Sequence, residues 1–149
     1  MQVNVRVIGV EELRRKLANV QNAARDMSKF WGAIGKYMRD RTITECFDKE
    51  QSPDGVKWAP WSEKYRRRME KAGKGGNKIL TNTSDLRRSI GYNAFKDSVV
   101  VSANSDHAKV HQFGDAKRNI PARPFLGVTE ADREEIKRCM KMYFDRAAK

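Results

Sequence analysis

The chain has 149 residues, 39% of them hydrophobic and 34% charged, and its formal net charge of +12 attracts polyanions or acidic proteins without indicating which. This length can bury a core without disulfides or metals, so we expect one domain over residues 1–149. No apolar run reaches the ~18–20 residues of a membrane span and no signal peptide opens the chain, so we expect a mature cytoplasmic protein.

The N-terminal third predicts a short strand and two helices. Residues 2–8 alternate valine with polar side chains, which is typical of a half-buried strand. Apolar side chains then recur every three or four residues over 10–27, with acids before cations, which predicts an amphipathic helix. A second helical pattern covers residues 30–47, where Gly32 and Gly35 either weaken the helix or let another backbone come close.

Residues 49–78 change character and are interpreted as a long basic loop. SPDG at its start favours a turn, because proline presets φ and glycine accepts positive φ. Residues 57–78 carry eight lysines and arginines against two glutamates, a net of +6 and half of the excess charge of the chain. The closing AGKGGNK lacks the GxxxxGK[ST] pattern of a phosphate-binding loop, so its glycines indicate mobility.

The C-terminal half predicts a hairpin between short helical segments. Residues 83–89 suit a short capped helix, and SIGYNAF and SVVVSA suit two strands joined by a tight turn at KD. HAKVHQFG predicts one or two helical turns closed by Gly114, and after the loop IPARPFLG a final helix is capped by Thr129. The order predicts an α+β fold: a small, mainly antiparallel sheet packed by two or three helices, with a long basic loop.

Few residues suggest catalysis or metal binding. His107 and His111 lie four apart, but a zinc site would need a third ligand, and local hydrogen bonding is the favoured interpretation. No serine, cysteine or carboxylate pair has the surroundings of a nucleophilic or acid–base site, so we expect no enzyme and no cofactor. Cys46 and Cys139 fall in apolar helix positions and are expected to be buried free thiols.

Two segments are candidate contact surfaces. The tryptophans and arginines of the basic segment combine stacking with positive charge, as nucleic-acid-binding surfaces do. WAPW equally suits anchoring a loop on the core, and RRR equally suits a solvated helix face. In IPARPFLG, each residue before a proline is held extended, so a stiff backbone presents arginine and phenylalanine as interface anchors. The candidate interface residues are Arg123, Phe125, Trp58, Trp61, Arg66, Arg67, Arg68, His111 and Phe113.

Five segments in order resemble a known family: SPDGVKWAPWSEKY, KILTNTSDLRRSI, VVVSAN, HAKVHQFG and IPARPFLG. They are similar to the bacteriophage virion-morphogenesis, or tail-completion, family, which includes the G protein of Mu-like phages. Each motif alone is weak, while the ordered series, over roughly residues 46–136, is specific. This chain departs from the pattern at Ser84 and Asp85, where the family often has a glycine, and at Trp61, where a smaller aliphatic is common.

The resemblance implies a non-enzymatic structural protein that acts late in virion assembly, as a tail-completion or head–tail neck component. It implies assembly into a ring, often a hexamer, with tail-tube or head–tail connector proteins as partners. The protein would reside in the bacterial cytoplasm during assembly and then in the virion. A ring needs two different surfaces on each subunit, for which IPARPFLG and the basic loop are candidates. The alternative is a nucleic-acid-binding accessory protein that uses residues 57–78, and DNA contact is possible in either case.

Overall fold

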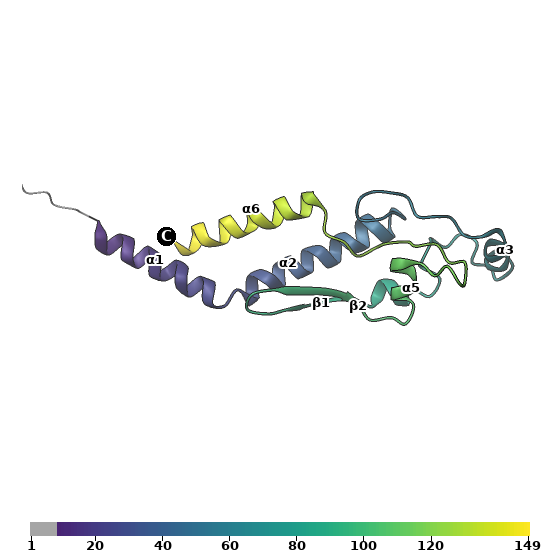
Figure 1. Ribbon diagram of the computed structural model, residues 1–149, viewed down its shortest axis with the longest axis horizontal. Coiled ribbons are helices and arrows are strands. Elements are labelled where there is room, and N and C mark those ends of the chain that lie inside the picture. The colour runs from purple at the N-terminus through teal and green to yellow at the C-terminus, as the bar shows by residue number, and fades with distance from the viewer. Residues whose placement is uncertain (1–8) are drawn as a thin grey trace, which may run out of the picture.

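A computed structural model describes residues 9–149, so the strand expected over residues 2–8 lies outside the described residues. The described chain is elongated, with helix α1 (Val10–Arg25) at one end and helix α3 (Glu63–Lys71) at the other (Figure 1). Helix α2 (Ser28–Arg41) forms the middle of the molecule. A hairpin lies along one side of it and helix α6 (Glu130–Ala147) along the other (Figure 1).

The first two helices are separated by a break at Asp26. This residue is extended (φ −144°, ψ 97°), and its carboxylate accepts a hydrogen bond of 2.9 Å from the backbone N–H of Ser28, the first residue of α2. The N–H of Met27 donates to the carbonyl of Lys96 in the hairpin turn, at 3.0 Å. The hairpin turn therefore holds the point at which α1 leaves the body of the molecule.

Helix α2 continues directly into a short π-helix over Thr42–Phe47. The hydroxyl of Thr42 donates to the carbonyl of Met38 at 2.8 Å, and such back-bonding perturbs a helix locally. The wider turn places Cys46 and Phe47 in the core, where both are fully buried. The helical pattern predicted over residues 30–47 is confirmed, although the sequence did not predict its π-helical end.

The hairpin consists of β1 (Ile90–Ala94) and β2 (Val99–Ala103), which pair antiparallel with Tyr92 opposite Val101. Both predicted strands are confirmed. The hairpin packs on α2 at Gly35, where an added Cβ would lie 2.7 Å from Cγ of Tyr92 and 2.8 Å from a methyl of Val99. Of the two roles that the sequence left open for this glycine, close approach is therefore the one that the structure shows.

Helix α6 starts at the predicted cap. The hydroxyl of Thr129 accepts a hydrogen bond from the N–H of Asp132 at 3.2 Å, and the Asp132 carboxylate accepts one from the N–H of Thr129 at 2.8 Å. Near its other end, the Tyr143 hydroxyl donates to the carbonyl of Ala23 in α1 at 3.1 Å. The apolar side of α6 packs on a buried row of α2 and the residue before it: Met27, Phe30, Ile34 and Met38.

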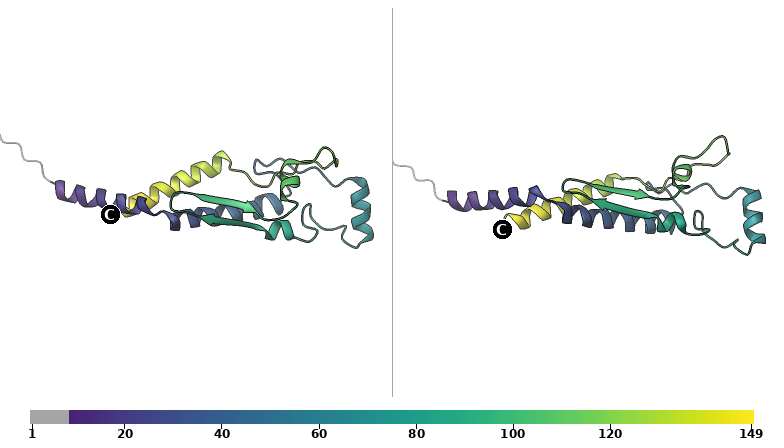
Figure 2. Two further views of the ribbon diagram at one scale, coloured as in Figure 1. Left: turned by 60° about the horizontal axis from the view of Figure 1, so that its bottom comes forward. Right: turned by 90° about the horizontal axis from the view of Figure 1, so that it is seen from below.

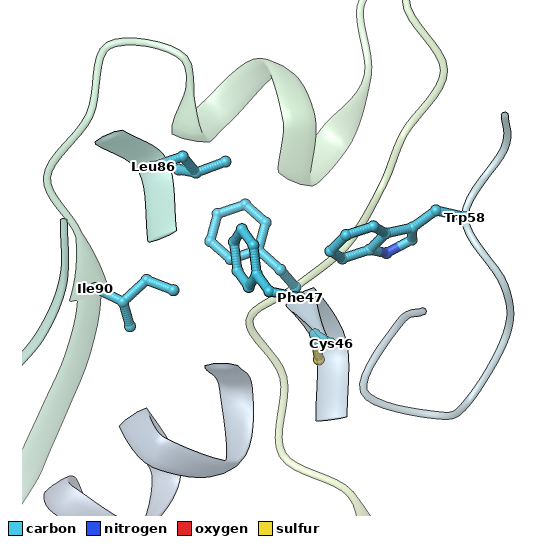
Figure 3. Close-up of a cluster of buried hydrophobic side chains, with 6 residues drawn as sticks. Cys46, Phe47, Trp58, Leu86 and Ile90 are labelled. Atoms are coloured by element: carbon cyan, nitrogen blue, oxygen red, sulfur yellow. The ribbon is translucent and has the colours of Figure 1, made fainter. Parts of the chain in front are cut away.

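A second core lies where the hairpin, the π-helix and the loops meet (Figure 3). Phe47 is in the middle of this cluster, and its ring lies edge-on to those of Trp58 and Phe125, each with centroids 5.6 Å apart. Helices α4 (Asp85–Arg88) and α5 (Ala108–Phe113) confirm the two short helical segments that the sequence predicted. The cluster consists of Cys46, Phe47, Trp58, Leu86, Ile90 and Phe125.

The basic segment is only partly a loop. Residues 63–71 form helix α3, and the hydroxyl of Ser62 caps it by accepting a hydrogen bond from the N–H of Tyr65 at 3.3 Å. Met69 is the buried residue of this helix, Tyr65 is partly buried, and the other residues of α3 are exposed. The long basic loop predicted over residues 49–78 is therefore interrupted by a helix, and the solvated helix face that the sequence left open for RRR is confirmed. The α+β class is confirmed by the helices and the two-stranded antiparallel sheet of the described chain.

Candidate functional site

Three motifs meet at one place, which we call the motif junction: WAPW (58–61), HQFG (111–114) and IPARPFLG (120–127). The side chain of Gln112 accepts hydrogen bonds from the N–H groups of Phe125 (3.1 Å) and Leu126 (3.0 Å) and donates to the Leu126 carbonyl (2.9 Å). The indole N–H of Trp58 donates to the carbonyl of Pro124 at 2.8 Å. These bonds satisfy polar groups of irregular backbone, so the junction locks the loops together.

Gly114 lets the chain fold back tightly within the junction. Its φ is +77°, and an added Cβ would lie 2.9 Å from the nitrogen of Ala122 and 3.0 Å from the carbonyl oxygen of Ile120. Just before it, the carbonyl of His111 accepts a 2.6 Å hydrogen bond from the N–H of Arg123. The end of α5 and the proline-framed loop therefore form one rigid unit.

Arg123 points into this unit. Its side chain is only 7% exposed, and its guanidinium donates to the carbonyls of Ala59 (2.8 Å) and Pro60 (2.9 Å). Carbonyls in a proline-containing loop have no helix or sheet partner, and the fork of guanidinium donors supplies one. The expectation that the stiff loop presents Arg123 to a partner is therefore wrong, because this side chain is used inside the subunit.

We expect Arg123→Met to lower the free energy of unfolding by about 2–3 kcal/mol, because two loop carbonyls lose hydrogen bonds from a charged donor that is itself buried. Urea unfolding would measure the change. Arg118→Met is the matched control, since the Arg118 side chain is 61% exposed and pairs with Asp115 at the surface. That control should change stability by less than about 1 kcal/mol, and equal losses in the two variants would contradict the internal role of Arg123.

Two other candidate interface residues belong to the core. Trp58 is 5% exposed and Phe125 is 1% exposed, because their rings fill the second core. In this structure both side chains anchor their loops on the core and neither is presented at the surface. Phe113, in contrast, faces solvent. It is 74% exposed on α5, close to the motif junction in sequence, and remains a candidate contact residue.

A groove of about 930 Å³ opens beside the motif junction. Trp61, Tyr65 and Arg68 line one part of it, and His107 and His111 line another. The structure therefore brings together candidate residues from the basic segment and from HQFG, which are far apart in the sequence. Burial, and then the positive charge of neighbouring Arg123, lowers the pKa of His111, so its imidazole is neutral at neutral pH.

The histidines and cysteines of the described chain do not gather. Among residues 9–149, no group of three or more histidine, cysteine, aspartate or glutamate side chains could hold a metal ion. Cys46 is a free thiol at 0% exposure, and burial raises its pKa to about 11. Cys139 is also free but only partly buried, so the prediction of two buried thiols is confirmed for Cys46 alone.

The three candidate arginines of α3 differ in their surroundings. Arg66 and Arg67 both pair with Glu63, at 2.6 Å and 2.9 Å. Arg68 instead lies over the ring of Tyr65, with its guanidinium carbon 4.8 Å from the ring centroid. All three are exposed at the end of the molecule opposite α1 (Figure 2).

Helix α1 carries a surface that the sequence did not identify as a site. It has no buried residue, and Val10, Leu13 and Leu17 are 40%, 58% and 60% exposed on one side. We call these three residues the α1 stripe. Their helical periodicity was visible in the sequence, but periodicity indicates an apolar face without indicating whether the same chain covers it.

No helix in the part of the chain that the structure describes is both long enough and apolar enough to cross a membrane.

Comparison with known proteins agrees with the motif order. A family model, described as the phage virion morphogenesis family, matches residues 8–145. The Mu-like prophage FluMu G protein 1 of Haemophilus influenzae is 27% identical over 129 residues, which are 86% of this chain and 84% of that protein. An uncharacterized protein of Methanocaldococcus jannaschii is 33% identical over 90 residues, 58% of this chain and 64% of the archaeal protein, so the alignment spans less than two thirds of that relative. No solved structure matches the chain. Since the family model extends over nearly all of the sequence, the chain belongs to the phage virion morphogenesis family.

Proposed function

We propose that the chain is a non-enzymatic assembly protein that completes the tail or the head–tail neck of a phage particle, working as a ring of identical copies. Membership of the virion morphogenesis family supports a role in building the particle. The exposed α1 stripe is the main observation in favour of self-assembly, because contiguous exposed apolar side chains mark contact surfaces.

The α1 stripe is suited to packing against another helix-bearing surface. Apolar residues follow one another at spacings of three, four, three and four from Val10 to Ala24, which is the spacing of a helix–helix seam. Near Ala23, α1 already packs on the end of α6, and toward its N-terminus α1 extends beyond α6 (Figure 1). A second copy laid along the exposed part would continue that seam, so we assign the stripe to a neighbouring subunit.

A closed ring also needs a different surface on each subunit to receive the α1 stripe. Phe113 is the best candidate anchor, because it is the most exposed large apolar side chain among the described residues and stands on the rigid unit that Gln112 and Gly114 hold. In this arrangement the motif junction supports the contact surface without forming it. That division of roles explains why Arg123 and Phe125 are buried beside an exposed Phe113.

We expect Leu13→Glu/Leu17→Glu to abolish self-association while changing the free energy of unfolding by less than about 0.5 kcal/mol per site, since both side chains are exposed. Light scattering across a concentration series, and rescue of a prophage that lacks the gene, would measure assembly. Asn19→Glu/Gln22→Glu adds the same charge to the opposite side of α1 and should assemble normally. Normal assembly and rescue by the leucine variant would overturn the proposed role of the stripe.

Mixing experiments test whether the interface joins two different surfaces. Phe113→Glu should block the receiving surface and leave the α1 stripe free. Mixed with the Leu13→Glu/Leu17→Glu protein, it should form pairs that cannot close into rings, because each partner has one intact surface. If Phe113→Glu alone still forms closed rings, the receiving surface lies elsewhere.

A further inference from the structure

Helix α3 sorts its charges onto separate faces. Glu63 and Glu70 pair with Arg66 and Arg67 on one face, at distances from 2.6 to 3.5 Å. Met69 points inward from another face. The third face holds Lys64, Arg68 and Lys71, which share one side of the helix because they are spaced by four and then three residues. We call these three residues the basic strip.

The basic strip is exposed and uncompensated. All three side chains face solvent, and none of them forms an ion pair within the described part of the chain. Lys74, in the turn after the helix, is likewise exposed, and its backbone N–H donates to the Met69 carbonyl at 2.8 Å, which holds the turn against the helix end. The helix lies at the tip of the elongated molecule in each view, where a long polymer can approach it (Figures 1 and 2).

The spacing of the strip matches a regular row of anions. Seven residues of helix separate Lys64 from Lys71, so the strip is about 10 Å long at 1.5 Å per residue. Phosphates on one strand of duplex DNA advance by about 3.4 Å along the axis per nucleotide and also rotate around it. The strip and its long side chains can therefore reach two or three successive phosphates without rearrangement of the helix.

The composition of the strip favours a nucleic acid over an acidic protein. Protein interfaces are centred on buried apolar or aromatic anchors and are depleted in lysine, whereas two of these three residues are lysines and no apolar side chain lies among them. Lysine acts as a point charge toward phosphate, and the third residue, Arg68, is held by the ring of Tyr65.

We propose that the basic strip binds double-stranded DNA through its phosphates, without reading base sequence. This inference goes beyond the assembly role and does not require a ring. In a particle, it gives the protein a contact with the genome at the end opposite the α1 stripe.

The test is the salt dependence of binding, measured by fluorescence anisotropy with the full chain and a labelled duplex of mixed sequence. The Leu13→Glu/Leu17→Glu background keeps self-association out of the measurement. Three phosphate contacts predict that the logarithm of the association constant falls with the logarithm of salt concentration with a slope of about −3. Lys64→Gln/Arg68→Gln/Lys71→Gln should reduce low-salt affinity at least about tenfold and bring the slope close to zero.

A matched control separates the strip from the overall charge. Lys29→Gln/Lys109→Gln/Lys149→Gln removes the same charge from exposed lysines elsewhere in the chain, and it should keep the parent slope. Equal losses in the two triple variants would overturn the proposal, because net charge alone would then explain binding. Absence of binding by the parent protein at low salt would also overturn it. Neither result bears on self-assembly, which is read separately by light scattering.

Discussion

Replacing Phe125 with alanine is expected to lower the free energy of unfolding by about 3–5 kcal/mol. The ring is 1% exposed and packs edge-on to Phe47, which also packs edge-on to the ring of Trp58. Neighbouring hydrogen bonds prevent the site from collapsing, because Gln112 fixes the backbone N–H of Phe125 and Trp58 fixes the carbonyl before it. Most of the volume of the ring would therefore remain as a cavity.

Chemical denaturation followed by two independent spectroscopic probes would measure this loss of unfolding free energy. Phe113→Ala provides the comparison. Phe113 has the same side chain in a neighbouring motif but is 74% exposed, so its removal should change stability by less than about 0.5 kcal/mol. Self-association should show the opposite ranking. Phe113→Ala should stay folded but associate less well, because it loses a contact side chain. A loss below about 1 kcal/mol for Phe125→Ala would show that the second core repacks around the missing ring.

The elements with long, regular patterns could be predicted from the sequence. Helix α6 has an apolar side, a Thr129 cap and acids in its first turn, and each of these local signals agrees with the fold. The hairpin was predictable because two valine-rich or aromatic runs flank a short turn. The break between the first two helices was predicted, but two residues late, because the apolar periodicity continues to Met27 while α1 ends at Arg25. The hydrogen bond that fixes the position of the break comes from distant Lys96.

The roles of individual side chains in the candidate site were harder to predict. Arg123 looked like a surface anchor because a charged side chain is normally exposed, and only the fold reveals the unpaired carbonyls of Ala59 and Pro60 that draw it inward. Helix α3 had a local signal, Ser62 followed by Glu63, but the flanking proline and glycines outweighed it. The groove could not be predicted at all, because its walls come from segments that meet only in the folded chain.

The distribution of polar and apolar groups separates the parts of the molecule that hold its shape from the parts left for partners. Three motifs that help to identify the family form hydrogen bonds mainly with one another: WAPW, HQFG and IPARPFLG. The least distinctive segment, α1, has no buried residue and carries a row of exposed apolar side chains. A motif that identifies the family therefore need not mark the surface that contacts a partner.

Asp132 is the second residue whose loss should have a large effect. It is 0% exposed, and one carboxylate oxygen forms an ion pair with the Nε of Arg41 at 2.9 Å and accepts a hydrogen bond from the hydroxyl of Tyr37 at 3.1 Å. The other oxygen accepts from the N–H (2.8 Å) and hydroxyl (2.6 Å) of Thr129. One carboxylate thus caps α6 and joins it to α2. Burial, together with this hydrogen bond to Asp132, raises the pKa of Tyr37.

Asp132→Ala should lower the free energy of unfolding by about 3–5 kcal/mol, because it leaves the largely covered guanidinium of Arg41 without its charge partner and removes the cap. Asp132→Asn keeps an acceptor for Thr129 but loses the charge, so its effect should be smaller. A double-mutant cycle with Arg41→Met then isolates the ion pair: the double variant should lose less than the sum of the single losses. If the two single losses simply add, the capping bonds alone account for the effect.

Neither Asp132 nor Arg41 lies on the α1 stripe or the basic strip. Any loss of assembly in these variants should therefore follow the fraction of unfolded protein. A stable but assembly-deficient Asp132→Asn protein would place this end of α6 at a subunit contact.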